Sequence, residues 1–299
     1  MKQKAKTLIP LLAVYLIWGS TYLVILYAIE EIPALMMAGT RFVAASLPLL
    51  IVLKLRGAAW PTVKQWRNAT LIGALMLAGG IGGVTFAEQW ISSSLAAIVV
   101  ATVPMWVAVW IGVMGKWPNS AEWLGLTLGL FGVIILNFGG QLTANPLGAI
   151  VLLCAPISWA LGSALSRRLD VPDGVMGYAI EMLAGGGLLL ILSTLRGEAI
   201  PTQLSSTAIW AWVYLVTFGS LIGFSAYMYL LRNVPTTLAT SYAYVNPIVA
   251  VVLGVLIADE AFSIWAFVAM TLIIISVITL SFAPKLEKYF VLRRRNYVG

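Results

Sequence analysis

The sequence TTLATSYAYVNP at residues 236–247 gives the first indication of how this chain folds. A related stretch stands 143 residues earlier, where SSLA at residues 93–96 is followed by Pro104, as TTLA is followed by Pro247. Both lie in long apolar segments, where a proline interrupts the backbone hydrogen bonding of a helix. The pair therefore indicates that two halves of one chain repeat the same helical unit.

Other matches support this repeat at an offset of 140 residues. The glycine pair Gly79 and Gly83 recurs as Gly219 and Gly223, LRG at residues 55–57 recurs at 195–197, and Trp18 recurs one position later as Trp159. Each unit holds five apolar stretches. An odd number of membrane crossings places the second unit upside down relative to the first, as in transporters built from inverted repeats.

Composition points to a membrane protein. Hydrophobic residues make up 61% of the chain, charged residues 10%, and the mean hydropathy is +0.97, which excludes an ordinary soluble domain. About 20 helical residues cross a bilayer. We predict an all-α integral membrane protein with ten transmembrane helices at residues 8–28, 34–55, 69–87, 95–114, 122–137, 147–166, 174–195, 208–231, 238–257 and 262–282. The two inverted five-helix repeats would occupy residues 1–141 and 142–283, with a basic cytoplasmic tail at 284–299.

The basic residues predict the orientation. With the N-terminus in the cytoplasm, sixteen Lys and Arg fall in inner segments and only Arg196 falls in an outer one. This bias predicts that both termini are cytoplasmic. The net charge of +7 then reflects topology and contact with anionic lipid, and nucleic acid need not be invoked as a partner.

Several classes of function are disfavoured by what the chain lacks. It contains no histidine and one cysteine, Cys154, so we expect no intrachain disulfide, no metal site and no cofactor. No glycine-rich loop of Walker spacing precedes Lys116, which argues against an ATP-driven motor. A membrane-embedded enzyme would need converging catalytic groups, and Glu181 is the single carboxylate that we place within a span.

Three tryptophans, Trp18, Trp106 and Trp159, are predicted near the middle of their spans, where an unpartnered indole N–H is costly. Packing between helices explains them as well as a cavity does, but the symmetry of Trp18 and Trp159 favours a cavity where the two repeats meet. The expected cavity residues are Trp18, Tyr22, Trp106, Trp159, Ser163, Tyr227, Thr240, Tyr244 and Asn246.

Pro104 and Pro247 are expected to kink the fourth and ninth helices, and Pro247 should free a backbone carbonyl near Ala243 as an unwound acceptor. A purely structural kink and a role in gating are equally compatible with the sequence.

Three charges are predicted to be buried or near span ends, and each has a structural and a functional interpretation: Arg41, Glu181 and Glu88. Arg41 and Glu181 stand 140 residues apart and should lie in opposite leaflets, so we expect no direct pair between them.

The chain resembles the EamA branch of the drug/metabolite transporter superfamily over residues 7–282. The residues that carry the resemblance are Trp18-Gly19-Ser20, Arg41-Phe42, Pro104, and the segment at 239–247, which is similar to bacterial amino-acid and metabolite exporters of YddG type. The resemblance implies a helical bundle with a central cavity and alternating access in the bacterial cytoplasmic (inner) membrane. It also implies export of amino acids or related small metabolites.

These observations predict a secondary transporter that exports amino acids, aromatic and other neutral ones included. Its partners would be a small-molecule substrate and membrane lipid, with a monomer favoured. The alternatives are a non-selective channel, a lipid-handling membrane protein or a proton-coupled drug exporter. Because neither Glu88 nor Glu181 has a visible buried acidic partner, gradient-following transport is favoured over tight proton antiport.

Overall fold

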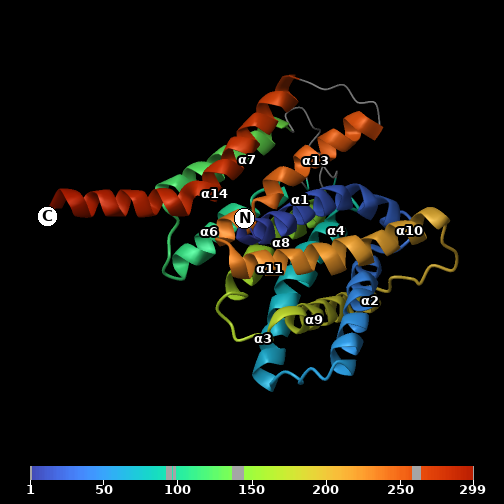
Figure 1. Ribbon diagram of the computed structural model, residues 1–299. Helices are drawn as coiled ribbons and strands as arrows, with labels where there is room; N and C mark the ends of the chain where they lie inside the picture. Colours follow the sequence, from blue (N-terminus) through green and yellow to red (C-terminus); the bar gives the residue numbers. More distant parts are fainter. Residues whose placement is uncertain (1, 92–95, 97–98, 137–144, 258–263, 299) are drawn as a thin grey trace.

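The computed structural model describes residues 2–91, 96, 99–136, 145–257 and 264–298, and all regular structure in these residues is helical. The helices form ten passes in two five-helix repeats, in agreement with the sequence (Figure 1). The first repeat contains α1 (Lys2–Ile29), α2 (Ala34–Leu55), a third pass of α3 (Val63–Gly73), η1 (Ala74–Gly82) and α4 (Gly83–Ala87), then α6 (Val103–Val113) and α7 (Ser120–Leu136). The second repeat begins with α8 (Pro146–Leu165) and α9 (Gly174–Leu195). Its third helix, the eighth pass, consists of α10 (Ser206–Tyr214), η2 (Leu215–Phe224) and α11 (Ser225–Asn233). The ninth pass consists of α12 (Thr236–Ala239) and α13 (Tyr242–Ile257), and the tenth is α14 (Ile264–Val298).

Six passes are long and apolar enough to cross a membrane: the first, second and third passes, and α8, α9 and the eighth pass. Apolar helical stretches of 10–17 residues lie in α6, α7 and α14. The 17 residues of α7 span about 26 Å, which is slightly less than the ~30 Å hydrocarbon layer. The predicted boundary between the repeats lies outside the described residues, as do residues 95, 97 and 98 of the predicted fourth span, 137 of the fifth and 262–263 of the tenth.

The repeated LRG sequences form helix ends. α2 ends at Leu55 and α9 ends at Leu195, and the following glycines adopt positive φ angles of 79° at Gly57 and 70° at Gly197. The amides of the next residues then bond back across the last turn, from Ala58 to the Leu53 carbonyl at 3.0 Å and from Glu198 to the Ser193 carbonyl at 3.1 Å. Glycine occupies both positions because it adopts the left-handed conformation without a steric penalty.

A second symmetric feature is the π-helical segment in the middle of the third and eighth passes. η1 contains Gly79 and ends just before Gly83, and η2 contains Gly219 and Gly223, so both π segments coincide with the repeated glycine pairs. In a π helix the backbone bonds reach one residue further than in an α helix. The neighbouring α-helical segments therefore present their faces in a different register from that of an uninterrupted α helix.

The first helix of each repeat packs on the other repeat. α1 contacts η2 and α13, and α8 contacts η1 and α6. α2 and α9 pack against each other, close to α3, while α7 and α14 form a separate pair on the opposite side of the bundle (Figure 1). This exchange of first helices places residues of both repeats around one central space.

The ninth pass is broken between α12 and α13 at Thr240 and Ser241, one turn earlier than we expected. The Ser241 hydroxyl lies 2.6 Å from the Tyr15 hydroxyl of α1, which ties the break to the first helix. Ala243 lies within α13, so the predicted unwound carbonyl at this position is wrong. Pro247 lies inside α13, whereas Pro104 lies in the first turn of α6, where a proline starts a helix without breaking it.

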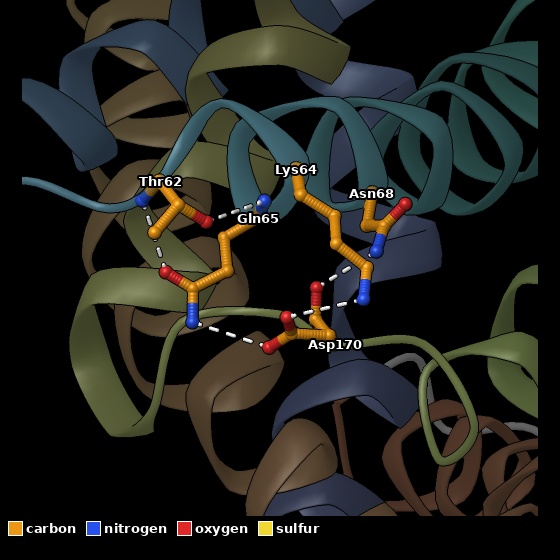
Figure 2. A network of polar contacts seen from close by, with 5 residues as sticks. All are labelled: Thr62, Lys64, Gln65, Asn68 and Asp170. Carbon is orange, nitrogen blue, oxygen red and sulfur yellow. Dashed lines mark hydrogen bonds and ion pairs between the residues drawn. The ribbon is translucent and has the colours of Figure 1, made fainter.

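Polar contacts fasten one end of the bundle (Figure 2). Asp170, in the loop between α8 and α9, accepts a 3.2 Å hydrogen bond from the Gln65 amide and lies 3.7 Å from Lys64 Nζ, and its backbone carbonyl accepts from Asn68 at 2.8 Å. Gln65 also completes a capping box with Thr62 at the start of α3. The loop before the second helix of one repeat is thereby joined to the third helix of the other.

The other repeat has a corresponding contact. Glu31, in the loop between α1 and α2, accepts a 2.7 Å hydrogen bond from the backbone amide of Ser205, which caps α10. Hydrogen bonds from Ser205 hold the pKa of the exposed Glu31 carboxyl below its usual value. The two loops are thus tied by related contacts on opposite repeats.

Candidate functional site

A cavity of about 80 Å³ lies where the two repeats meet. Its walls come from α1, α2, the third pass, α6, α8 and α13. Most of the surface is apolar or aromatic, with the indoles of Trp18 and Trp159 and the ring of Tyr242 among the lining groups. Its polar side chains are those of Thr21, Tyr22, Arg41, Thr85 and Asn246. Apolar walls with a few convergent polar groups are typical of small-molecule sites.

Several of these polar groups have no protein partner. Among the described residues, the Thr85 hydroxyl, the Asn246 carbonyl oxygen and the Nε and Nη1 atoms of Arg41 are buried without a hydrogen bond. The Tyr22 hydroxyl interacts with the Asn246 side chain. Buried polar atoms in native proteins almost always have a partner in protein or water. The cavity therefore offers unused hydrogen-bonding capacity to whatever enters it.

Arg41 and Glu88 contribute opposite charges to this region. Arg41 is 2% exposed and Glu88 is 6% exposed. Their charges interact, but they form no ion pair within 4.0 Å, and neither carboxylate oxygen of Glu88 has a hydrogen-bond partner among the described residues. Glu88 follows Thr85 by three residues at the end of α4, which places both near one face of the third pass.

An aromatic cluster closes one side of the cavity. Trp18 contacts Trp159, Tyr227 and Tyr242, with ring centroids 5.5, 5.2 and 4.7 Å apart. The Tyr227 hydroxyl accepts a 3.2 Å hydrogen bond from the Trp159 indole and lies 2.8 Å from the Ser163 hydroxyl. Both repeats contribute rings to this cluster, so a change in their relative position would disturb it.

The π segments hold the first helices of the opposite repeats. The Trp18 indole donates a 3.1 Å hydrogen bond to the Gly219 carbonyl in η2, and the Ser158 hydroxyl donates a 2.7 Å bond to the Leu75 carbonyl in η1. Glycine allows this close approach: a Cβ atom at Gly223 would lie 2.5 Å from Trp18 Nε1, and one at Gly80 would lie 2.7 Å from the Trp159 ring. The glycines therefore set the position of both indoles.

The predicted cavity residues divide into two groups. Trp18, Tyr22, Trp159 and Asn246 line the cavity, and Tyr227 lies in the aromatic cluster that bounds it, with Ser163 bonded behind it. The structure places Trp106, Thr240 and Tyr244 elsewhere. Trp106 is 36% exposed in the first turns of α6, so its indole does not need the cavity as a partner.

Tyr244 and Thr240 find partners in the backbone. The Tyr244 hydroxyl donates a 3.0 Å hydrogen bond to the Leu126 carbonyl, and its ring packs with α7 and α14. The Thr240 hydroxyl bonds to the Thr236 carbonyl at 2.9 Å within its own helix. The sequence analysis missed three lining residues that carry a hydroxyl group: Thr21, Thr85 and Tyr242. Tyr242 was visible as part of the polar ninth span, and the other two carried no signal beyond a hydroxyl in an apolar helix.

A second, larger space of about 540 Å³ lies at the ends of α6, α8 and α11 and beside the start of α12. Its lining includes Lys116, Arg167, Arg168 and Arg232, with Glu122 as an acidic member. The arginines are engaged with backbone carbonyls: Arg167 with Val234 at 2.9 Å, Arg168 with Met114 at 2.8 Å and Arg232 with Pro172 at 3.2 Å. These hydrogen bonds hold the loops around the space in position.

Glu181 lies apart from the central cavity. It is fully buried in α9, and both its carboxylate oxygens lack a hydrogen bond within the described part of the chain. Its charge interacts with that of Arg232. No group of three metal-binding side chains is found among the described residues.

Comparison with known proteins identifies the family. The model of the EamA-like transporter family matches residues 5–138 and 146–282, one match for each repeat. The inner membrane transporter YedA of Escherichia coli (strain K12) is 48% identical over 269 residues, covering 90% of this chain and 88% of YedA. The transporter YoaV of Bacillus subtilis (strain 168) is 24% identical, covering 87% of this chain and 91% of YoaV.

A solved crystal structure with 19% sequence identity shares the fold, with a TM-score of 0.77 over 95% of this chain and 99% of the other. Both five-helix units match the family model, and a transporter of the inner membrane matches nearly the whole chain. The chain therefore belongs to the EamA-like transporter family.

Proposed function

We propose that this transporter moves amino acids, aromatic and other neutral ones included, by alternating access through the central cavity, in the direction of export. The observation that carries the proposal is a set of buried polar atoms on Arg41, Thr85 and Asn246 that have no partner in the described part of the chain and lie within aromatic walls contributed by both repeats. A small polar molecule with an apolar side chain would satisfy both kinds of surface.

The charge of the cavity argues against phosphorylated substrates. Among the described residues that line the cavity, Arg41 is the single basic one. Phosphate groups are usually held by several charge-assisted or bidentate contacts from Arg or Lys. The aromatic rings of Trp18, Trp159 and Tyr242 favour instead a substrate with an apolar or aromatic portion.

The size of the cavity supports alternating access. About 80 Å³ accommodates a few water molecules, whereas small-molecule pockets usually measure ~300–1,000 Å³. An amino acid would therefore require the repeats to move apart. The aromatic cluster of Trp18, Trp159, Tyr227 and Tyr242 lies where such a movement would open or close a path.

We infer that both termini face the cytoplasm and that the space of about 540 Å³ is on the cytoplasmic side. Its lining residues Lys116, Arg167, Arg168 and Arg232 belong to the basic set that the charge bias places inside. Reporter fusions at each terminus test this orientation. A C-terminal reporter active only in the periplasm contradicts it.

Transport by the purified protein in liposomes tests the function. Labelled phenylalanine and leucine should cross the membrane down their gradients, with and without a pH gradient, and should compete with each other. Trp159→Ala should lower this flux, whereas Trp106→Ala, outside the cavity, should not. Movement of a phosphorylated sugar without movement of amino acids contradicts the proposal. Abolition of uphill movement when the pH gradient is removed would instead identify a proton-coupled transporter.

A further inference from the structure

The two charges near the central cavity are arranged differently from an ordinary buried ion pair. Arg41 and Glu88 are both almost fully buried and come from different passes, α2 and the end of α4. They interact electrostatically yet make no contact within 4.0 Å. Burying opposite charges is costly unless each is paired closely and hydrogen-bonded. In the described part of the chain, two guanidinium nitrogens and both carboxylate oxygens lack partners.

The remaining contacts position the two groups without satisfying them. The guanidinium carbon of Arg41 lies 4.6 Å from the ring centroid of Phe42, so a cation–π contact supports the side chain, and Nε and Nη1 have no hydrogen-bond partner among the described residues. Glu88 also lies close enough to Tyr22 for its charge to act on the Tyr22 hydroxyl, and Tyr22 lines the cavity. The guanidinium of Arg41 therefore lines the cavity, and the carboxyl group of Glu88 lies one helical turn beyond the lining residue Thr85.

A zwitterion matches this arrangement. A guanidinium binds a carboxylate through two parallel N–H donors, and a carboxylate accepts hydrogen bonds from an ammonium group. The Thr85 hydroxyl and the Asn246 oxygen line the cavity with Arg41 and offer further atoms without a partner among the described residues. The indoles of Trp18 and Trp159 provide the apolar surface for a side chain.

We propose that Arg41 and Glu88 form a dipolar recognition site, in which Arg41 binds the carboxylate and Glu88 binds the ammonium group of the same substrate molecule. This rests on the proposed function and adds to it that the substrate must carry both charges. A solute with one charge leaves the other protein group buried and unpaired, which excludes it. The carboxylate and the ammonium group of the substrate thus determine selectivity, whereas the aromatic walls accept side chains of different shapes.

Three probes that share one phenyl group separate the two roles: phenylalanine, with both charges; phenethylamine, with the amine alone; and 3-phenylpropanoate, with the carboxylate alone. Binding to the purified protein is measured by calorimetry, and uptake is measured in liposomes. The wild-type protein should bind phenylalanine about tenfold or more tightly than either single-charge probe.

The variants should lose affinity selectively. Glu88→Gln should weaken phenylalanine about tenfold without weakening 3-phenylpropanoate, and Arg41→Gln should weaken phenylalanine similarly without weakening phenethylamine. The double variant Arg41→Gln/Glu88→Gln removes both charges, so neither is left buried without the other, and it replaces a single variant that does not fold. It should bind all three probes with similar affinity. Glu181→Gln, which removes a buried carboxylate outside the cavity, should leave the preference for the zwitterion intact.

The outcomes distinguish this inference from the proposed function. If phenylalanine is transported but the variants weaken all three probes equally, or the wild-type protein binds phenethylamine as tightly as phenylalanine, the dipolar site is refuted and amino-acid transport stands. If the wild-type protein neither binds nor moves any amino acid, both are refuted.

Discussion

Substitution of Gly223 by alanine tests whether the π segment positions the cavity. The added Cβ would lie 2.5 Å from Nε1 and 2.9 Å from Cδ1 of Trp18, and 3.2 Å from the Phe218 carbonyl oxygen. The indole cannot simply move away, because it donates to the Gly219 carbonyl and is packed against Trp159, Tyr227 and Tyr242. Overpacking costs about 1–3 kcal/mol. Loss of a buried hydrogen bond costs a further 1–3 kcal/mol or so.

We therefore expect Gly223→Ala to lower the free energy of unfolding by about 2–6 kcal/mol and to reduce transport. Unfolding in mixed micelles measures the first quantity. Gly187→Ala is the matched control, because a Cβ there meets nothing within 4 Å, so alanine in a helix should be neutral or stabilising by up to about 1 kcal/mol. Trp18→Phe should relieve the clash and make the double variant non-additive. A Gly223→Ala protein as stable as Gly187→Ala would refute the reasoning.

Three further predictions concern single contacts. Tyr227→Phe leaves the Trp159 indole N–H without its acceptor and should destabilise the protein by about 1–3 kcal/mol, as measured by the same unfolding assay. Asp170→Asn removes an exposed ion pair and should change stability by at most about 1 kcal/mol, and a larger loss would show that the contact matters more than its exposure suggests. Since the pKa of Glu31 is lowered, its hydrogen bond to the Ser205 amide should persist above the ordinary carboxyl value of 4.5 and weaken as the pH falls through the lower folded-state pKa, which amide hydrogen exchange at Ser205 would report.

Much of the fold follows from the sequence because the bilayer constrains it. The limits of α2 and α9 agree with their predicted spans, because the apolar composition of each span and the LRG sequence at its end determine these limits without contacts to other helices. The π segments could not be predicted, because residues 74–82 and 215–224 have the composition of an ordinary apolar α helix. Their register is set by contacts with the opposite repeat, such as the Ser158 bond to Leu75.

The sequence predicted how deep the site residues lie along their spans, but not the direction in which their side chains point. Trp106 and Trp159 were both expected near mid-span, yet Trp159 lines the cavity and Trp106 is partly exposed, since depth does not determine which side of a helix faces inward. Tyr244 was expected to face the cavity because of its polar neighbours, but a backbone carbonyl of α7 satisfies its hydroxyl. Arg41 lines the cavity, and its relation to Glu88 depends on the packing of two passes that sequence spacing does not reveal.

The π segment η1 also limits which insertions and deletions the chain can tolerate. Each residue of an α helix turns the following residues by about 100°. A π segment holds one residue more than the α helix that would join the same two ends, because each of its backbone bonds reaches one residue further. Deleting one residue between Ala74 and Gly82 would therefore allow an α helix to form there, with the following residues close to their present orientation. Deleting one residue from the α-helical turn just before Thr85 would instead rotate Thr85 and Glu88 by roughly 100°, and Thr85 would leave the cavity lining. A shortening of the third pass is thus tolerated in η1 and not in α4.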